Sequence, residues 1–163
     1  METSRTEGRP PGRQHAAGRT VDLPRSAVRL VLALFLAGAG ISHFTATDAF
    51  RAQVPPWVPA VEWVIWVSGV VEIALALALA LAPARRRPLV GWVTAAFFVA
   101  VFPGNVSQLV TGTDAFGLDT DVARSVRLLF QPALVVAALW STGAWAVWRE
   151  RRRRDAGSAD PLG

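Results

Sequence analysis

Four long apolar stretches, separated by short polar segments, dominate the hydrophobic pattern of the chain. They cover residues 27–44, 63–82, 89–110 and 126–148. Each is close to or beyond the roughly 20 residues that a helix needs to cross the hydrocarbon core of a bilayer. The pattern predicts an all-α fold, a four-transmembrane-helix bundle that occupies residues 25–148 and has the lipid bilayer as its surroundings.

The first apolar stretch raises one alternative, a secretory signal peptide behind an arginine-rich tail. No A-x-A-like cleavage site follows residues 27–44, and the stretch is longer than the ~7 to 15 apolar residues of a signal-peptide core. We therefore expect it to remain in the mature protein as the first span.

Composition supports a membrane protein and limits its chemistry. Of the 163 residues, 52% are hydrophobic and only 18% are charged, which leaves too little polar surface for an ordinary soluble protein. The chain contains no cysteine, so it forms no disulfide and offers no thiol nucleophile or thiolate ligand for a metal. We expect no cofactor in the chain itself, so redox chemistry would require a bound molecule or a partner.

Arginine residues predict the orientation in the membrane. All 17 basic residues are arginine, and most lie within residues 5–29, 85–87 and 149–154. Four spans place these three segments on one side, which the positive-inside rule assigns to the cytoplasm. We therefore expect a multi-pass protein of the plasma membrane with both termini cytoplasmic. Because the basic residues flank the spans, we expect no nucleic-acid partner.

The tails and the first loop carry weaker signals. Residues 1–24 and 149–163 are predicted to be basic, disordered cytoplasmic tails because they lack apolar periodicity. In the first loop, Phe50, Val54 and Trp57 recur at roughly helical spacing among three prolines, which indicates a short segment lying on the outer surface. An interfacial connector is favoured over a lid across a site.

Polar residues inside the first two spans indicate a buried site. The first span ends with His43 at its outer end, and Gly38 and Ser42 form a small-xxx-small face for close helix approach. The second span carries Ser68 and Glu72 on one helical face. A carboxyl near the middle of the bilayer costs roughly 2.5 to 3.5 kcal/mol, so it should face the bundle interior and be protonated or paired.

The third and fourth spans add amides and a guanidinium at overlapping depth. Asn105 and Gln108 follow Pro103, which leaves a backbone carbonyl without its usual donor. Arg127 and Gln131 share a face of the fourth span, and Arg127 can snorkel outward or turn inward to the carboxyl of the second span. These groups predict a shared polar pocket in the outer half of the bundle, with a structural role in helix packing as the alternative. The candidate pocket or ligand-binding residues are His43, Ser68, Glu72, Asn105, Gln108, Arg127 and Gln131, and none is assigned as catalytic or metal-binding.

Five short motifs occur along the chain in an order that matches a known family. They are G-x-x-HF (40–44), PPW-x-P (55–59), SG-x-x-E (68–72), FPGN (102–105) and RLLFQ (127–131). Over about residues 34–140 the chain resembles the DoxX-like family of small four-helix membrane proteins. It departs from the family at Gly104, where alanine is frequent, and at Leu129, where proline is frequent. The second departure affects where the fourth span bends. The inward placement of Arg127 depends on that bend.

The resemblance implies an architecture more firmly than an activity. It carries over Glu72, Asn105, Arg127 and Gln131 as pattern residues. Some relatives are named as subunits of a quinone-reducing thiosulfate oxidoreductase, and others are linked to oxidative-stress complexes, while most members have no settled activity. The resemblance therefore implies a redox-associated membrane subunit that binds a quinone or another lipophilic molecule and receives electrons from a partner protein.

Two other classes of function stay open at this point. The first is a non-enzymatic membrane scaffold or assembly factor whose polar core is structural. The second, a carrier or channel, is less favoured because four spans without internal repeats give little of the usual transporter machinery. An oligomer would bring together more spans for a transport pathway, so oligomerisation stays open as well.

Overall fold

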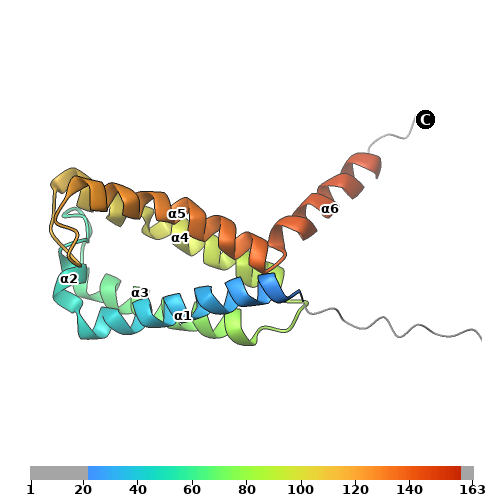
Figure 1. The fold of residues 1–163 in the computed structure, drawn as a ribbon, viewed down its shortest axis with the longest axis horizontal. Helices are drawn as coiled ribbons and strands as arrows, with labels where there is room; N and C mark the ends of the chain where they lie inside the picture. Colours follow the sequence, from blue (N-terminus) through green and yellow to red (C-terminus); the bar gives the residue numbers. More distant parts are fainter. Residues whose placement is uncertain (1–21, 159–163) are drawn as a thin grey trace, which may run out of the picture.

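The computed structural model describes residues 22–158, and this part of the chain is helical apart from its connecting segments (Figure 1). The helices are α1 (Leu23–Thr45), α2 (Thr47–Arg51), α3 (Val61–Leu81), α4 (Arg87–Thr111), α5 (Asp121–Ser141) and α6 (Ala144–Ser158). The helices α1, α3, α4 and α5 are long and apolar enough to cross a membrane. The predicted all-α bundle is confirmed.

The four long helices form two pairs, α1 with α3 and α4 with α5 (Figure 1). The helix α1 also contacts α5, and α3 contacts α4, whereas the described residues show no such contact between α1 and α4 or between α3 and α5. The order around the bundle is therefore α1, α3, α4, α5. The two pairs lie close together at the end that holds the connection 82–86, and they diverge toward the end that holds α2. We call these the terminal end and the loop end.

The hydrophobic core lies where all four long helices meet, away from the loop end. Many large apolar side chains outside this core point outward, as expected for helices surrounded by lipid, where association depends on close packing more than on burial from water. The core includes Leu32, Leu36, Leu75, Leu79, Ala95, Phe98 and Ala138. The outward-facing apolar residues include Leu34, Val67, Leu77, Leu129 and Val136.

Helices α1 and α3 approach each other closely at two glycines. A Cβ added to Gly40 would lie 2.8 Å from the Gly69 carbonyl oxygen, and a Cβ added to Gly69 would lie 2.8 Å from His43 Cβ. The predicted contact face of Gly38 and Ser42 is wrong, because Gly38 is exposed and an added Cβ there would meet nothing within 4 Å. The small-residue contact lies instead on the face of α1 that carries Gly40.

The side chain of Arg29 is buried despite its charge. Its guanidinium donates hydrogen bonds to the carbonyls of Leu79 and Ala80. These carbonyls belong to the C-terminal end of α3, where backbone oxygens lack donors within the helix. Arg29 therefore ties the start of α1 to the end of α3 and belongs to the packed fold as well as to the basic segment 5–29.

The fourth span ends earlier than the apolar pattern predicts. The helix α5 covers Asp121–Ser141, and Gly143 then adopts a left-handed conformation with φ of 74° before α6 begins. Glycine adopts this conformation without a Cβ penalty, so the chain turns here and α6 leaves the bundle (Figure 1). The predicted span 126–148 therefore joins parts of two helices.

Part of the predicted disorder in the tails does not hold. Residues 149–158 are helical, with Arg154 paired to Glu150 one turn away and Arg152 lying 4.6 Å from the Trp148 ring centroid. Both contacts support a helix. At the other end α1 already begins at Leu23. The remaining predictions of disorder concern residues 1–21 and 159–163, which lie outside the described residues.

Candidate ligand pocket

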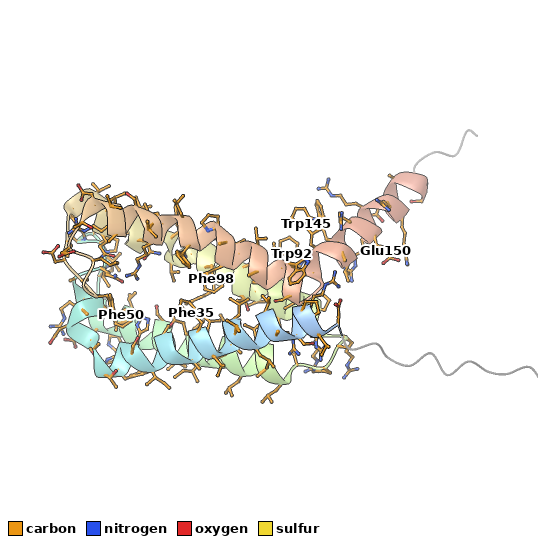
Figure 2. The ribbon with its side chains drawn as sticks, viewed as in Figure 1. Phe35, Phe50, Trp92, Phe98, Trp145 and Glu150 are labelled. Atoms are coloured by element: carbon orange, nitrogen blue, oxygen red, sulfur yellow. The ribbon has the colours of Figure 1, made fainter. Side chains whose placement is uncertain are left out.

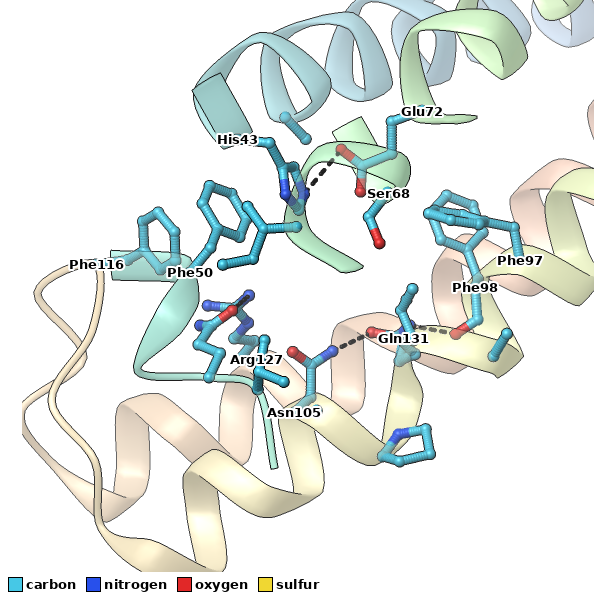
Figure 3. Close-up of a pocket in the computed structure, with 18 of the residues that line it drawn as sticks. His43, Phe50, Ser68, Glu72, Phe97, Phe98, Asn105, Phe116, Arg127 and Gln131 are labelled. Atoms are coloured by element: carbon cyan, nitrogen blue, oxygen red, sulfur yellow. Dashed lines mark hydrogen bonds and ion pairs between the residues drawn. The ribbon is translucent and has the colours of Figure 1, made fainter. Parts of the chain in front are cut away.

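A cavity of about 830 Å³ lies between the two helix pairs toward the loop end (Figure 3). Its walls come from the four long helices, from the segment around α2 and from the loop between α4 and α5. The volume falls within the range of small-molecule pockets in proteins. The lining is largely apolar and includes the aromatic side chains of Phe35, Phe50, Phe97, Phe98, Phe116 and Phe130.

All but one of the predicted site residues line this cavity. The exception is Gln108, which is 1% exposed and lies behind the wall. The residues that line the cavity come from all four long helices, so the predicted convergence of polar groups from separate spans is present in the structure. They are His43, Ser68, Glu72, Asn105, Arg127 and Gln131.

One wall of the cavity carries a pair of ionisable groups, His43 on α1 and Glu72 on α3. His43 Nε2 lies 3.4 Å from Glu72 Oε2, and both side chains are nearly buried. The sequence offered Arg127 as the partner for this carboxyl, and the structure instead places His43 beside it. The reason is topological, because α5 is diagonal to α3 whereas α1 is its neighbour.

The His43–Glu72 pair has unused hydrogen-bonding capacity. Within residues 22–158, neither His43 Nδ1 nor Glu72 Oε2 has a hydrogen-bond partner, although both atoms are buried. A buried polar atom without a partner costs about 1–3 kcal/mol, so such atoms are few in folded proteins and call for an explanation. Ser68, one turn before Glu72 on α3, lies beside the pair (Figure 3). The His43–Glu72 pair is therefore an incompletely satisfied polar group in the cavity wall.

The opposite wall is built around an amide chain on α4 and α5 (Figure 3). Asn105 Nδ2 donates to Gln131 Oε1 at 2.6 Å, and Gln131 Nε2 donates to the Phe98 carbonyl at 2.5 Å. This carbonyl lies one residue before the one that Pro103 leaves without its helical donor. The amide chain therefore joins α5 to α4 beside the proline, and it leaves Asn105 Oδ1 and Arg127 as the freer polar groups of this wall.

A second hydrogen-bond chain fastens the loops over the cavity. The guanidinium of Arg127 donates to Gln53 Oε1 at 3.1 Å, and Gln53 Nε2 donates to Gln108 Oε1 at 2.9 Å. Gln108 Nε2 in turn donates to the carbonyls of Thr113 and Ala115 at 3.3 and 3.4 Å. Gln108 therefore links α4 to both loops, and it supports the cavity wall without lining it.

Aromatic rings cover the cavity at the loop end. Phe50 of α2 stacks on His43 with ring centroids 3.6 Å apart and meets Phe116 edge-on at 4.7 Å. Arg127 lies 5.5 Å from the centroid of Phe116. Phe116 has a φ of 57°, an uncommon conformation for a bulky residue, so these contacts hold a strained loop in place. The segment around α2 therefore forms part of the site and is more than the interfacial connector that the sequence favoured.

Outside the cavity, Arg124 anchors the loop that precedes α5. Its side chain is 6% exposed and pairs with Asp114 and with Asp121, the latter at 2.8 Å. Both carboxylates are largely exposed, so the pairs hold a buried guanidinium to the edge of the bundle. This cluster is structural and contributes nothing to the cavity lining.

The residues that sequence reasoning missed come mainly from the loops. Gln53, Phe50 and Phe116 line the cavity, and none was predicted as a site residue. Gln53 carried a weak signal, because it is an amide between the apolar Phe50 and Val54, and the alternative interpretation of this segment as a lid would have included it. Phe116 carried no such signal.

The fold and the cavity define a class of protein, a helical bundle of four candidate membrane spans around an internal pocket. Residues 32–142 match a family described as a domain of unknown function (DUF8561), and this match covers more than half of the chain, so the protein belongs to that family. No curated protein and no solved structure matches the chain. Within residues 22–158, no three His, Cys, Asp or Glu side chains are grouped to hold a metal ion.

Proposed function

We propose that this protein binds a quinone or another lipophilic small molecule in the cavity between its helix pairs. The observation that carries the proposal is the composition of the cavity walls. Within a largely aromatic and aliphatic lining, His43 and Glu72 lie on one wall and Arg127 lies on the other. Convergent polar groups inside an apolar cavity are the usual features of a small-molecule site.

The two walls suit the two carbonyl oxygens of a quinone ring. Arg127 and the second N–H of the Asn105 amide can donate hydrogen bonds to one oxygen, while Gln131 is already engaged with Asn105 and with a backbone carbonyl. His43 and Glu72 can relay protons to the quinone from the other wall. Reduction of a quinone takes up two electrons and two protons, so the proposal includes a redox partner protein that supplies the electrons.

The resemblance to the DoxX-like family supports the same proposal. Its pattern residues Glu72, Asn105, Arg127 and Gln131 come from three different helices, and all of them line one cavity. A set of residues carried over from a sequence pattern alone need not converge in space. Their convergence favours a shared site over four unrelated polar positions.

We also propose that the protein lies in the plasma membrane with both termini in the cytoplasm. The arginines of residues 85–87 and 149–154 belong to the terminal end, whereas Asp48, Asp114 and Asp121 belong to the loop end. This asymmetry favours a cytoplasmic terminal end by the positive-inside rule. The cavity would then lie in the outer half of the bilayer.

The binding proposal is tested on the full-length protein purified in mild detergent. Co-purifying lipids are extracted and identified, and thermal unfolding is followed with and without added quinone. We expect quinone to raise the Tm of the wild type and of Glu62→Gln, a control on α3 whose carboxyl is exposed and outside the cavity lining. Glu72→Gln should abolish the shift. Absence of quinone in the extract together with no shift in any form would contradict the proposal.

A non-enzymatic scaffold is the second candidate, and particular contacts favour it. Gln108 and Gln131 bond to backbone carbonyls, and Arg124 holds a loop, so several polar residues have a structural role. If the whole polar set is structural, Glu72→Gln and Arg127→Gln should each lower the folded yield, and the double variant should cost no more than either single change. A folded Glu72→Gln protein that no longer binds quinone would favour the pocket.

A further inference from the structure

We infer that the cavity opens sideways between α1 and α5 and receives an amphiphile from the bilayer, with a polar head inside and a hydrocarbon tail that passes out between these helices. This inference rests on the proposed binding function and adds the class of ligand and its route. The ligand class is an uncharged polar ring or head group attached to an isoprenoid or acyl chain.

Side chains partly cover both ends of the cavity. At the loop end, Phe50 stacks on His43 and meets Phe116 edge-on, and the hydrogen bonds of Gln53 fasten the segment that carries Phe50. Toward the terminal end, Leu36 and Phe98 line the cavity and also belong to the hydrophobic core.

The side between α1 and α5 carries three exposed apolar residues of the cavity lining. Phe35 of α1 and Phe130 of α5 both line the cavity, yet they are 53% and 62% exposed. Figure 2 shows Phe35 on the side of α1 that faces the α4–α5 pair. A side chain that lines a cavity and is also exposed at the surface of the bundle lies at an opening. On the opposite side of the bundle, Val64 of α3 also lines the cavity and is less exposed, at 39%. We call the opening formed by Phe35, Val126 and Phe130 the lateral window.

The chemistry of the lateral window fits a hydrocarbon tail. Its three residues are apolar, and they belong to helices whose outward surfaces are those of membrane spans. Phe130 lies about 4.5 Å along α5 from Arg127, and Phe35 lies about 12 Å along α1 from His43, at 1.5 Å per residue. On α5 the window therefore lies at the level of the polar wall, and on α1 it reaches toward the terminal end. A head group between the polar walls would have its tail directed into the window.

The test uses photocross-linking to a tailed ligand. Full-length variants carry benzoylphenylalanine in place of Phe35 or Phe130, and the controls carry it in place of Leu34 or Leu129, which are adjacent, similarly exposed and outside the cavity lining. The probe is an isoprenoid quinone with an alkyne at the end of its tail, added to protein in lipid nanodiscs. We expect several-fold more labelling at positions 35 and 130 than at 34 and 129, and an excess of untagged isoprenoid quinone should suppress it.

The outcomes separate the inference from the function on which it rests. Equal labelling at all four positions, with the Glu72-dependent thermal shift intact, would overturn the lateral window and leave quinone binding standing. Preferential labelling with benzoylphenylalanine in place of Val64, which lines the cavity on the opposite side of the bundle, would overturn the exit between α1 and α5. Absence of a Glu72-dependent shift with either the tailed or a tail-less quinone would overturn the binding function and the inference together.

Discussion

Gly40 and Gly69 meet where α1 packs on α3, and this contact sets His43 against Glu72. A Cβ on Gly40 would lie 2.8 Å from the Gly69 carbonyl oxygen, closer than real Cβ contacts. His43 lies three residues after Gly40, and Glu72 lies three residues after Gly69, so each ionisable group shares a helical face with one glycine. The 3.4 Å separation of the imidazole and the carboxyl therefore depends on the absence of two Cβ atoms.

Gly69→Ala should destabilise the bundle. The new Cβ would lie 2.8 Å from His43 Cβ and 3.0 Å from the Gly40 carbonyl oxygen, so the helices would have to separate. Overpacking of this kind costs about 1–3 kcal/mol, which thermal unfolding in detergent would show as a lower Tm. Gly38→Ala is the matched control, since its Cβ would meet nothing within 4 Å. A Gly69→Ala protein as stable as Gly38→Ala would contradict the close approach.

Two glycines of α4 should respond in opposite ways to alanine. A Cβ at Gly91 would lie 2.9 Å from Thr142 Cβ and 3.1 Å from the Ala138 carbonyl oxygen, whereas a Cβ at Gly104 would lie 3.6 Å from the Gln53 carbonyl oxygen, an ordinary contact. We expect Gly91→Ala to lower the Tm. Gly104→Ala should leave the Tm unchanged or raise it, because alanine favours helix over glycine by about 1 kcal/mol. The reverse order of stability would refute these packing distances.

Gln131→Leu should lower the stability of the fold. It should also reduce the further loss of stability that Asn105→Ala causes. The substitution leaves the Phe98 carbonyl without the side-chain donor from α5 and the Asn105 amide without its acceptor. A buried polar group left without a partner costs about 1–3 kcal/mol. In a double-mutant cycle with Asn105→Ala, the loss of stability should be less than additive. Additive losses in chemical or thermal unfolding would show that the two amides act independently.

Arg124→Gln should loosen the loop between α4 and α5, whereas Arg51→Gln should have little effect. Arg124 is buried and holds Asp114 and Asp121, and hydrogen bonds to charged groups contribute about 1.5–3 kcal/mol. Arg51 is half exposed and pairs with the exposed Glu62 at 2.7 Å, and exposed pairs contribute about 0.2–1 kcal/mol. Hydrogen exchange of the backbone amides of residues 112–120 measures the difference. Equal exchange in both variants would exclude the anchoring role.

The spans and most of the polar residues that line the cavity could be predicted because depth in a membrane is encoded along the chain. Consecutive spans run in opposite directions, so distance from a helix end gives the level of a polar residue in the bilayer. Glu72, Asn105 and Arg127 were placed at overlapping levels by this argument, and all three line the cavity. Depth does not specify which helices are neighbours. The choice of His43 over Arg127 as the partner of Glu72 depends on the order of helices around the bundle, which is a tertiary property.

Helix spacing also grouped Gln108 with Asn105 in the predicted pocket, whereas the structure places Gln108 behind the cavity wall. Residues three apart on a helix differ by about 60° in direction at 3.6 residues per turn, and this is enough for Asn105 to face the cavity while Gln108 faces the loops. The end of α5 was missed for another reason. Apolar residues continue through Trp148, so Gly143 looked like one small residue within a long span, although its positive φ divides the run into two helices.

The arrangement of the bundle as two pairs has a consequence for biogenesis. Each pair consists of successive spans, α1 with α3 and α4 with α5, and the connection 82–86 is the covalent link between them. The chain is thus a series of two helical hairpins, each of which can enter the membrane as a unit. Because the cavity is bounded by both hairpins, it comes into existence only when they dock. Ligand occupancy would therefore report the last step of assembly, and a chain divided at this connection would regain binding only through complementation of its two halves.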